Sequence, residues 1–203
     1  TLTLLLGCKT PPPPGPPMPT LPTGNFTTPA HPSLGEIERL DPTLDQLIAR
    51  EAVIEQLADG FDWAEGPVWV QPAQGEGFVL FSDIPPNKIY KWSEADGLEN
   101  FLQPSGYTGT TLRAGQPGSN GLLLDAQGRL VLCQHGDRRI ARLASSLNAP
   151  QPTYQTVIGT YQGKRFNSPN DGCFDRHGNL YFTDPPYGLE KRMSDPAKDC
   201  LLY

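Results

Sequence analysis

The sequence predicts an all-β fold made of propeller-like blades, because one strand–turn–strand pattern occurs twice at a fixed spacing. The first copy runs from Asn120 to Leu130 and the second from Asn170 to Leu180, an offset of 50 residues (170 − 120 = 50). Repeats of this length with several strands each are typical of β-propellers. The 23 Pro and 21 Gly among 203 residues also disfavour a mainly helical fold.

Each copy of the repeat contains a tight turn between two apolar runs. In the first copy the turn spans 125–128, with Asp first and Gly last, and in the second it spans 175–178 with the same two residues at its ends. Asp at the first position and Gly at the last favour a four-residue hairpin connection built on a type I turn.

The N-terminal residues resemble the end of a bacterial lipoprotein signal peptide. Residues 1–8 form an apolar run that ends at Cys8, the residue that would carry the lipid. The run is too short to span a bilayer, and a chance apolar start with a free Cys is the alternative. Lys9 rather than Asp after this Cys resembles outer-membrane lipoproteins. We therefore expect a lipid-anchored protein at the periplasmic face of the bacterial cell envelope.

A Pro-rich segment at 9–33 follows, and its composition predicts a disordered, extended linker. Residues 34–203 are expected to form the N-terminal portion of the propeller. Asp41 and Pro42 are typical of a helix start, so a short helix is expected there. Residues 53–57 alternate in polarity, which predicts a strand.

The first blade-like unit begins at Glu65. Strong strand patterns occupy 78–83 and 88–92, with Asn87 in the turn between them, and 98–103 is expected to be an edge strand.

The next two units begin near Asn120 and Asn170. Residues 192–203 show no strand pattern. The chain therefore holds about two and a half to three blades.

Polar residues recur where the innermost strand of each unit should begin, namely Glu65, Asn120 and Asn170. In a propeller such positions surround one central channel. One carboxylate and two carboxamides offer hard oxygen ligands, which suit Ca²⁺ best, with Mg²⁺ or Zn²⁺ as alternatives. Such an ion can polarise a carbonyl group. The alternatives are that Asn before Gly is a turn residue and that Glu65 is simply exposed.

Charge and cysteine content exclude two other classes. A net charge of −6 argues against a nucleic-acid partner, because phosphate contacts need clustered Lys and Arg. The four Cys lack C-x-x-C spacing, which argues against a zinc ribbon. We expect Cys133 and Cys173, which lie in apolar strand patterns, to be core fillers.

Several motifs resemble the gluconolactonase/senescence marker protein (regucalcin) family. They are, in order, Ile37 to Pro42, Ala58 to Phe61, Glu65 to Trp69, Cys133 to Arg139, Ser168 to Asp171, and Phe182 to Gly188. The resemblance implies a six-bladed propeller that hydrolyses a sugar lactone, such as gluconolactone, around a divalent metal.

By that resemblance, Glu65 and Asn170 would be metal ligands and Asn120 would line the substrate pocket. The family's Pro-Asn-Gly and Pro-Asp-Gly motifs do not follow residue 190 here. We therefore expect a truncated chain, whose general-base Asp lies beyond residue 203 and which is inactive alone.

Three further residues have more than one interpretation each. Asp171 is expected to bind the ion, to contact substrate or to brace Asn170, and Tyr187 to wall the pocket or to hold a rim loop. His135 is a candidate proton shuttle or a strand-end His bonded to backbone. The functional alternatives are a related propeller that hydrolyses esters or organophosphates, and a non-enzymatic, surface-anchored binding propeller.

Overall fold

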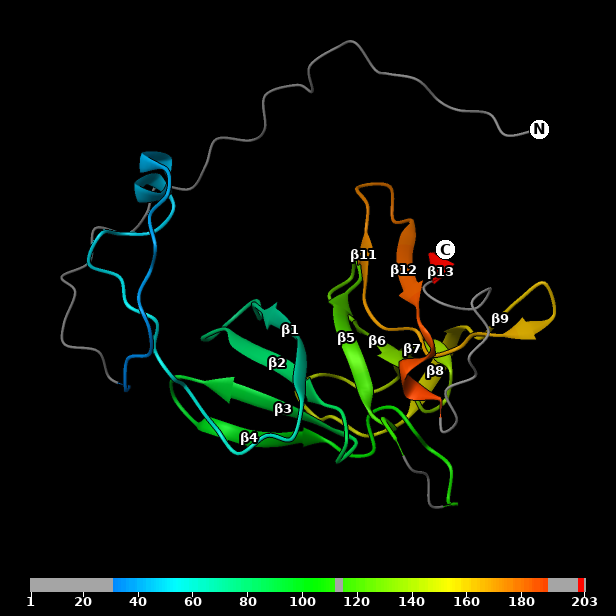
Figure 1. Ribbon diagram of the computed structural model, residues 1–203. Coiled ribbons are helices and arrows are strands. Elements are labelled where there is room, and N and C mark those ends of the chain that lie inside the picture. The colour runs from blue at the N-terminus through cyan, green and yellow to red at the C-terminus, as the bar shows by residue number, and fades with distance from the viewer. Residues whose placement is uncertain (1–30, 112–114, 190–200, 203) are drawn as a thin grey trace, which may run out of the picture. The chain divides into compact units, whose positions relative to one another are not determined.

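The computed structural model describes residues 31–111, 115–189 and 201–202 (Figure 1). The predicted signal segment, its Cys8 and the linker up to residue 30 lie outside the described residues. The chain divides into two compact units, one up to Asp59 and the other from Gly60 onward.

The described part of the first unit contains little regular structure. The helix expected after Asp41 is a 3₁₀ helix, η1 (Pro42–Gln46), with no buried residue, and the Asp41 carboxylate caps it by accepting from the Thr43 N–H at 2.8 Å. The strand predicted at 53–57 is wrong, because only an isolated bridge joins Glu55 to Ser33. An alternating pattern forms a strand only where a partner continues the ladder.

The second unit begins with a four-stranded antiparallel sheet. Its strands are β1 (Ala64–Val70), β2 (Phe78–Asp83), β3 (Lys88–Ser93) and β4 (Gly97–Leu102), paired in chain order. The predicted strands are confirmed, including the edge strand. Asn87 occupies the β2–β3 turn at a φ of 60°, a conformation that Asn tolerates better than most residues.

A second four-stranded antiparallel sheet follows with the same order. It consists of β5 (Ser119–Leu124), β6 (Leu130–Gln134), β7 (Arg139–Leu143) and β8 (Tyr154–Ile158). A short hairpin of β9 (Thr160–Tyr161) and β10 (Lys164–Arg165) leads on from it.

The third sheet comprises β11 (Gly172–Phe174), β12 (Leu180–Asp184) and β13 (Leu201–Leu202), with the 3₁₀ helix η2 (Pro186–Gly188) after β12. The expectation of no strand in 192–203 is wrong, because β13 pairs with Thr183 and Asp184. Two Leu residues are too short a run to give a periodic signal.

Both predicted hairpin turns are confirmed. The Gly128 N–H donates to the Asp125 carbonyl at 2.8 Å, and the Gly178 N–H donates to the Asp175 carbonyl at 3.0 Å. Both glycines have positive φ, 71° and 83°. Gly at the last turn position therefore serves a backbone conformation that other residues adopt only with strain.

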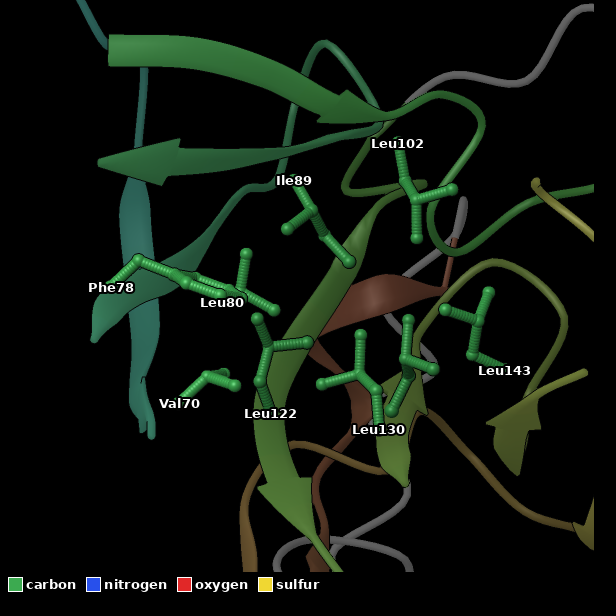
Figure 2. Close-up of a cluster of buried hydrophobic side chains, with 9 residues drawn as sticks. Val70, Phe78, Leu80, Ile89, Leu102, Leu122, Leu130 and Leu143 are labelled. Carbon is green, nitrogen blue, oxygen red and sulfur yellow. The ribbon is translucent and has the colours of Figure 1, made fainter. Parts of the chain in front are cut away.

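Two hydrophobic clusters hold the three sheets in a stack, and β6 contributes to both. Leu130 and Leu132 face the first sheet, whereas Val131 and Cys133 face the third. Figure 2 shows the first cluster between β1–β4 and the second sheet. Its buried members are Val70, Phe78, Leu80, Ile89, Leu102, Leu122, Leu130, Leu132 and Leu143.

The second sheet is thus buried on both faces, which explains why all five residues of β6 are buried. Stacked, antiparallel four-stranded sheets in an all-β chain match the predicted propeller-like architecture. None of the helical segments in the described part of the chain has the length and apolarity needed to cross a bilayer.

Candidate functional site

The inner strands of the three sheets lie side by side. Strand β1 contacts β5, and β5 contacts β11 (Figure 1). Glu65 lies at the second position of β1, Asn120 at the second position of β5, and Asn170 two residues before β11. The structure therefore brings together the strand ends that carry the three sequence-predicted polar residues.

Gly66 allows β1 and β5 to approach each other closely, at the first of the two junctions between inner strands. It has a φ of 60°, and a Cβ atom placed on it would lie 2.3 Å from the Asn120 carbonyl oxygen. The β1–β2 ladder shifts register between Glu65 and Val68, so Gly66 sits in a bulge. Gly is required here by both conformation and space.

The second junction joins Asn120 directly to Asn170. The Asn120 side-chain amide donates to Asn170 Oδ1 at 2.8 Å, and the Gly121 N–H donates to the Asn170 carbonyl at 2.7 Å. Asn120 is 6% exposed, and its carbonyl also accepts from the Ser82 hydroxyl at 2.8 Å. Asn120 is thus an interior strand residue, not the turn residue that Asn-Gly suggests.

Asp171 lies at the same junction. A Cβ atom on Gly121 would lie 2.5 Å from Asp171 Oδ1, and that oxygen accepts the Gly172 N–H at 2.9 Å. The Asp171 carbonyl also accepts the backbone N–H of Thr183 on β12 at 2.9 Å. The structure therefore places the Asp171 carboxylate against β5, next to Asn170.

Glu65 is exposed, and its carboxylate has a specific donor. The indole Nε1–H of Trp63 donates to Glu65 Oε1 at 3.0 Å. Trp63 lies two residues before Glu65, in the bend that leads into β1.

Buried side chains at the ends of the second strands hold the segments that lead into the inner strands. Asp83, the last residue of β2, is 2% exposed, and it accepts the backbone N–H groups of Trp63 at 2.8 Å and Asp62 at 3.3 Å. This carboxylate fixes the main chain immediately before Glu65.

Asp184, the last residue of β12, does the same for the third inner strand. Its two oxygens accept the backbone N–H groups of Asn167 and Ser168, both at 2.8 Å. Burial raises the pKa of Asp184 above its ordinary value, and the two N–H donors and Arg138 offset that rise only in part. Asp184 thereby fixes the chain two residues before Asn170.

Gln134 occupies the equivalent place at the end of β6. Its amide donates to the Ser105 carbonyl at 2.8 Å, and the Ser105 hydroxyl accepts the Ser119 N–H at 3.0 Å. Sequence reasoning missed these three residues. The signal was present, because Asp83, Gln134 and Asp184 recur at nearly the same interval as the inner-strand residues (134 − 83 = 51; 184 − 134 = 50).

The other two candidate site residues, Tyr187 and His135, differ in their exposure to solvent. Tyr187 is in η2 and is 48% exposed, so its ring is open to solvent. His135 is fully buried, and Gly188 packs so closely on it that an added Cβ atom would lie 2.6 Å from the His135 Cβ. The His135 backbone N–H donates to the Gly118 carbonyl at 3.3 Å.

The two cysteines of the described region have different surroundings. Cys133 is fully buried in the second hydrophobic cluster, as expected, whereas the expectation that Cys173 fills the core is wrong, because Cys173 is exposed on β11. Burial, with a contribution from the Asp171 charge, raises the pKa of the Cys133 thiol far above its ordinary value. Cys133 therefore stays a neutral thiol and packs as a core residue.

The donor set at the inner strands fits part of a calcium site. Glu65 offers a carboxylate, and Asn170 Oδ1 retains a lone pair beside the one that the Asn120 amide uses. Both are hard oxygen ligands, although Ca²⁺ takes six to eight of them in total. Within the described residues, no group of three or more His, Cys, Asp or Glu is arranged to hold a metal ion.

Comparison with known proteins agrees with this architecture. A gluconolactonase from Zymomonas mobilis subsp. mobilis is 40% identical over 170 residues, which cover 82% of this chain and 46% of that protein. A solved gluconolactonase structure from Xanthomonas campestris matches with a TM-score of 0.63 and 29% identity, over 86% of this chain and 51% of that one. A further structure, from the Northeast Structural Genomics Consortium, matches with a TM-score of 0.56 and 34% identity, over 73% and 47%.

The chain spans about half the length of the relatives it matches. The family model for the SMP-30/gluconolactonase/LRE-like region matches residues 63–202, which include all three stacked sheets and the inner-strand residues. The chain therefore belongs to the SMP-30/gluconolactonase/LRE-like family.

Proposed function

We propose that the protein containing this chain hydrolyses a sugar lactone, such as gluconolactone, with the help of a divalent metal ion, Ca²⁺ by preference. The main support is the contact of Asn120 with Asn170 at the meeting point of the inner strands, next to the Gly66 junction that follows Glu65. Its relatives from Zymomonas mobilis and Xanthomonas campestris are gluconolactonases.

In this proposal Glu65 and Asn170 hold the ion, and Asn120 holds Asn170. A bound ion would supply Lewis acidity toward the lactone carbonyl and would lower the pKa of a coordinated water. Asn120 contributes by donating to Asn170 Oδ1, which fixes the direction of that carboxamide. Asp83 and Asp184 contribute by fixing the segments before Glu65 and Asn170.

The reaction is the addition of water to the lactone carbonyl carbon, followed by cleavage of the ring C–O bond. The ring oxygen takes a proton and leaves as an alcohol, and the product is an open-chain hydroxy acid. Asp171 and the exposed Tyr187 are proposed to contact the sugar hydroxyls, since they can accept and donate hydrogen bonds respectively.

The test is Glu65→Gln in the protein expressed from the complete reading frame. We expect kcat/KM for gluconolactone to fall at least about 100-fold and calcium affinity to fall with it, because a charged ligand is lost. The matched control is Glu76→Gln, in the exposed β1–β2 loop, which should change neither quantity. Turnover that survives EDTA, or that Glu65→Gln leaves unchanged, would contradict the proposal.

The same assay separates the alternatives. Hydrolysis of an aryl ester or an organophosphate triester in preference to gluconolactone would assign the site to a related propeller hydrolase. Unchanged metal affinity in Glu65→Gln, with no turnover of any of these substrates by the parent protein, would favour a binding propeller.

We also propose that Cys8 is lipidated and anchors the protein at the periplasmic face of the cell envelope. The apolar run before this Cys and the Pro-rich linker after it support the proposal. Recovery of a Cys8→Ser variant in the membrane fraction, at the level of the parent protein, would argue against it.

A further inference from the structure

Trp63 combines an unusual exposure with a specific bond. Its side chain is 51% exposed, yet its indole N–H donates to Glu65 Oε1 at 3.0 Å. An exposed Glu side chain normally samples several rotamers, because no contact favours one of them. A rigid indole with two side-chain torsions can select one direction for the carboxylate at a small entropic cost.

The main chain of Trp63 is itself held on both sides. Its N–H donates to the buried Asp83 carboxylate at 2.8 Å, and its carbonyl accepts the Ile84 N–H at 3.2 Å. Both contacts come from the end of β2, which is anchored in the first hydrophobic cluster through Leu80. A continuous series of contacts therefore runs from the core through Asp83 and Trp63 to the Glu65 carboxylate.

The hydrogen bond engages one carboxylate oxygen, which leaves Glu65 Oε2 available for another partner. A hydrogen bond to an ionised carboxylate is stronger than one between neutral groups. Side chains that donate to a ligating carboxylate orient it, and their loss typically costs 10–100-fold in metal affinity.

We propose that Trp63 is a positioning residue that aims the Glu65 carboxylate, and that Asp83 secures Trp63 for this task. The consequence for metal binding rests on the function proposed above. The hydrogen bond itself does not, so it can be tested separately.

The first experiment examines the hydrogen bond by NMR on the ¹⁵N-labelled protein. The Trp63 indole N–H resonance is assigned as the signal lost in Trp63→Phe. We expect Glu65→Gln to shift this resonance and to leave that of Trp69 in place. An unshifted Trp63 resonance would overturn the proposal, whether or not the protein binds metal.

The second experiment measures calcium affinity by titration calorimetry. We expect Trp63→Phe to weaken binding about 10-fold. Trp69→Phe is the matched control, because Trp69 is similarly exposed (54%) but lies on β1 over Gly77 instead of beside Glu65, and it should leave the affinity unchanged.

A double variant distinguishes positioning from a general structural role. In the Glu65→Gln background, Trp63→Phe should have no further effect on calcium affinity, since the group it orients is gone. Additive losses, or an equal loss in Trp69→Phe, would overturn the positioning role. If the parent protein binds no calcium, the proposed function fails and the NMR result alone decides whether Trp63 aims Glu65.

Discussion

Gly121 shows how one residue sets the distance between two inner strands. A side chain at this position would meet Asp171 Oδ1 at 2.5 Å and the Asn170 carbonyl oxygen at 2.9 Å. Neither neighbour can easily move, because the Asn170 carbonyl accepts from Gly121 itself and Asp171 Oδ1 accepts the Gly172 N–H. The contact between Asn120 and Asn170 depends on this close approach.

We therefore predict that Gly121→Ala destabilises the protein by about 1–3 kcal/mol, the usual cost of overpacking. Chemical denaturation monitored by circular dichroism measures the change. Gly159→Ala is the control, because its added Cβ atom would make only ordinary contacts, the nearest at 3.5 Å, and should change stability by less than about 1 kcal/mol. Equal losses in the two variants would show that the approach of the strands is not the cause.

At this scale the sequence predicted which polar residues recur, but not what surrounds them. The register of Glu65, Asn120 and Asn170 follows from the 50-residue repeat, and the structure brings the corresponding strand ends together. Asn120 next to Gly121 equally fits a turn, because the pair is common there. Only the neighbouring strand, which the local sequence does not describe, shows that the glycine is needed for close packing.

The two repeated hairpin turns are the elements that the sequence predicted best, since their interactions are local. Asp125 Oδ1 accepts the backbone N–H groups of Gln127 and Arg129, and Asp175 Oδ1 accepts those of His177 and Asn179. The second carboxylate oxygen of Asp125 accepts from Arg129 Nε at 2.7 Å. Asp at the first turn position thus satisfies donors that the turn leaves open.

These bonds give the Asp125 turn a definite pH dependence. Burial raises the pKa of Asp125, but the hydrogen bonds and charge of Arg129 and the Gln127 N–H outweigh it, so the pKa lies below the ordinary value of 3.8. A carboxyl group with a lowered folded-state pKa stabilises the protein above its unfolded pKa, and the contribution is lost as the pH falls through the folded-state pKa.

We predict that Asp125→Asn lowers the urea midpoint at pH 7 and that the deficit shrinks as the pH falls below 3.8. The charge pair with Arg129 is what the variant lacks at neutral pH, and the parent protein loses it on protonation. Urea denaturation of both proteins between pH 3 and pH 7 measures the difference. A deficit of constant size would mean that the ionised carboxylate is not responsible.

Elements held by distant contacts were predicted less well. Asp83, Gln134 and Asp184 recur with the repeat, yet a polar residue at a strand end is usually solvated, so nothing local indicated that they are buried. Strands β9, β10 and β13 were missed because strands of two residues carry no periodicity. The strand expected at 53–57 had the periodicity but no continuous partner.

At the scale of the whole second unit, the central sheet joins its neighbours into one stack. Leu132 and Cys133, adjacent in β6, are fully buried in opposite clusters, one shared with the first sheet and one with the third. Neighbouring residues of β6 face opposite clusters, but the sequence of this strand up to Cys133 is a continuous apolar run without polar residues between. Such a run is expected for a strand covered on both faces. The blade count of the intact protein remains a prediction.

Because the first and second sheets share one hydrophobic cluster, we predict that a defect in the first sheet weakens the second. Leu80 is fully buried in β2 and belongs to the cluster that includes Leu122 and Leu130 of the second sheet (Figure 2). Leu80→Ala should lower the free energy of unfolding by about 2–5 kcal/mol, the range for buried Leu→Ala changes. Leu98→Ala should cost much less, because Leu98 is 40% exposed on the edge strand of the same sheet.

Hydrogen exchange measured by NMR can locate the effect. If the two sheets open as one cooperative unit, Leu80→Ala lowers the protection of amides in β6 and β7 by the same free energy as in β2 and β3. Protection lost in β1–β4 alone would show that the sheets open independently, despite their common core. In that case the segments carrying Glu65 and Asn120 would separate in a partly open state. Under the function proposed above, calcium affinity should then fall in Leu80→Ala although the second sheet keeps its protection.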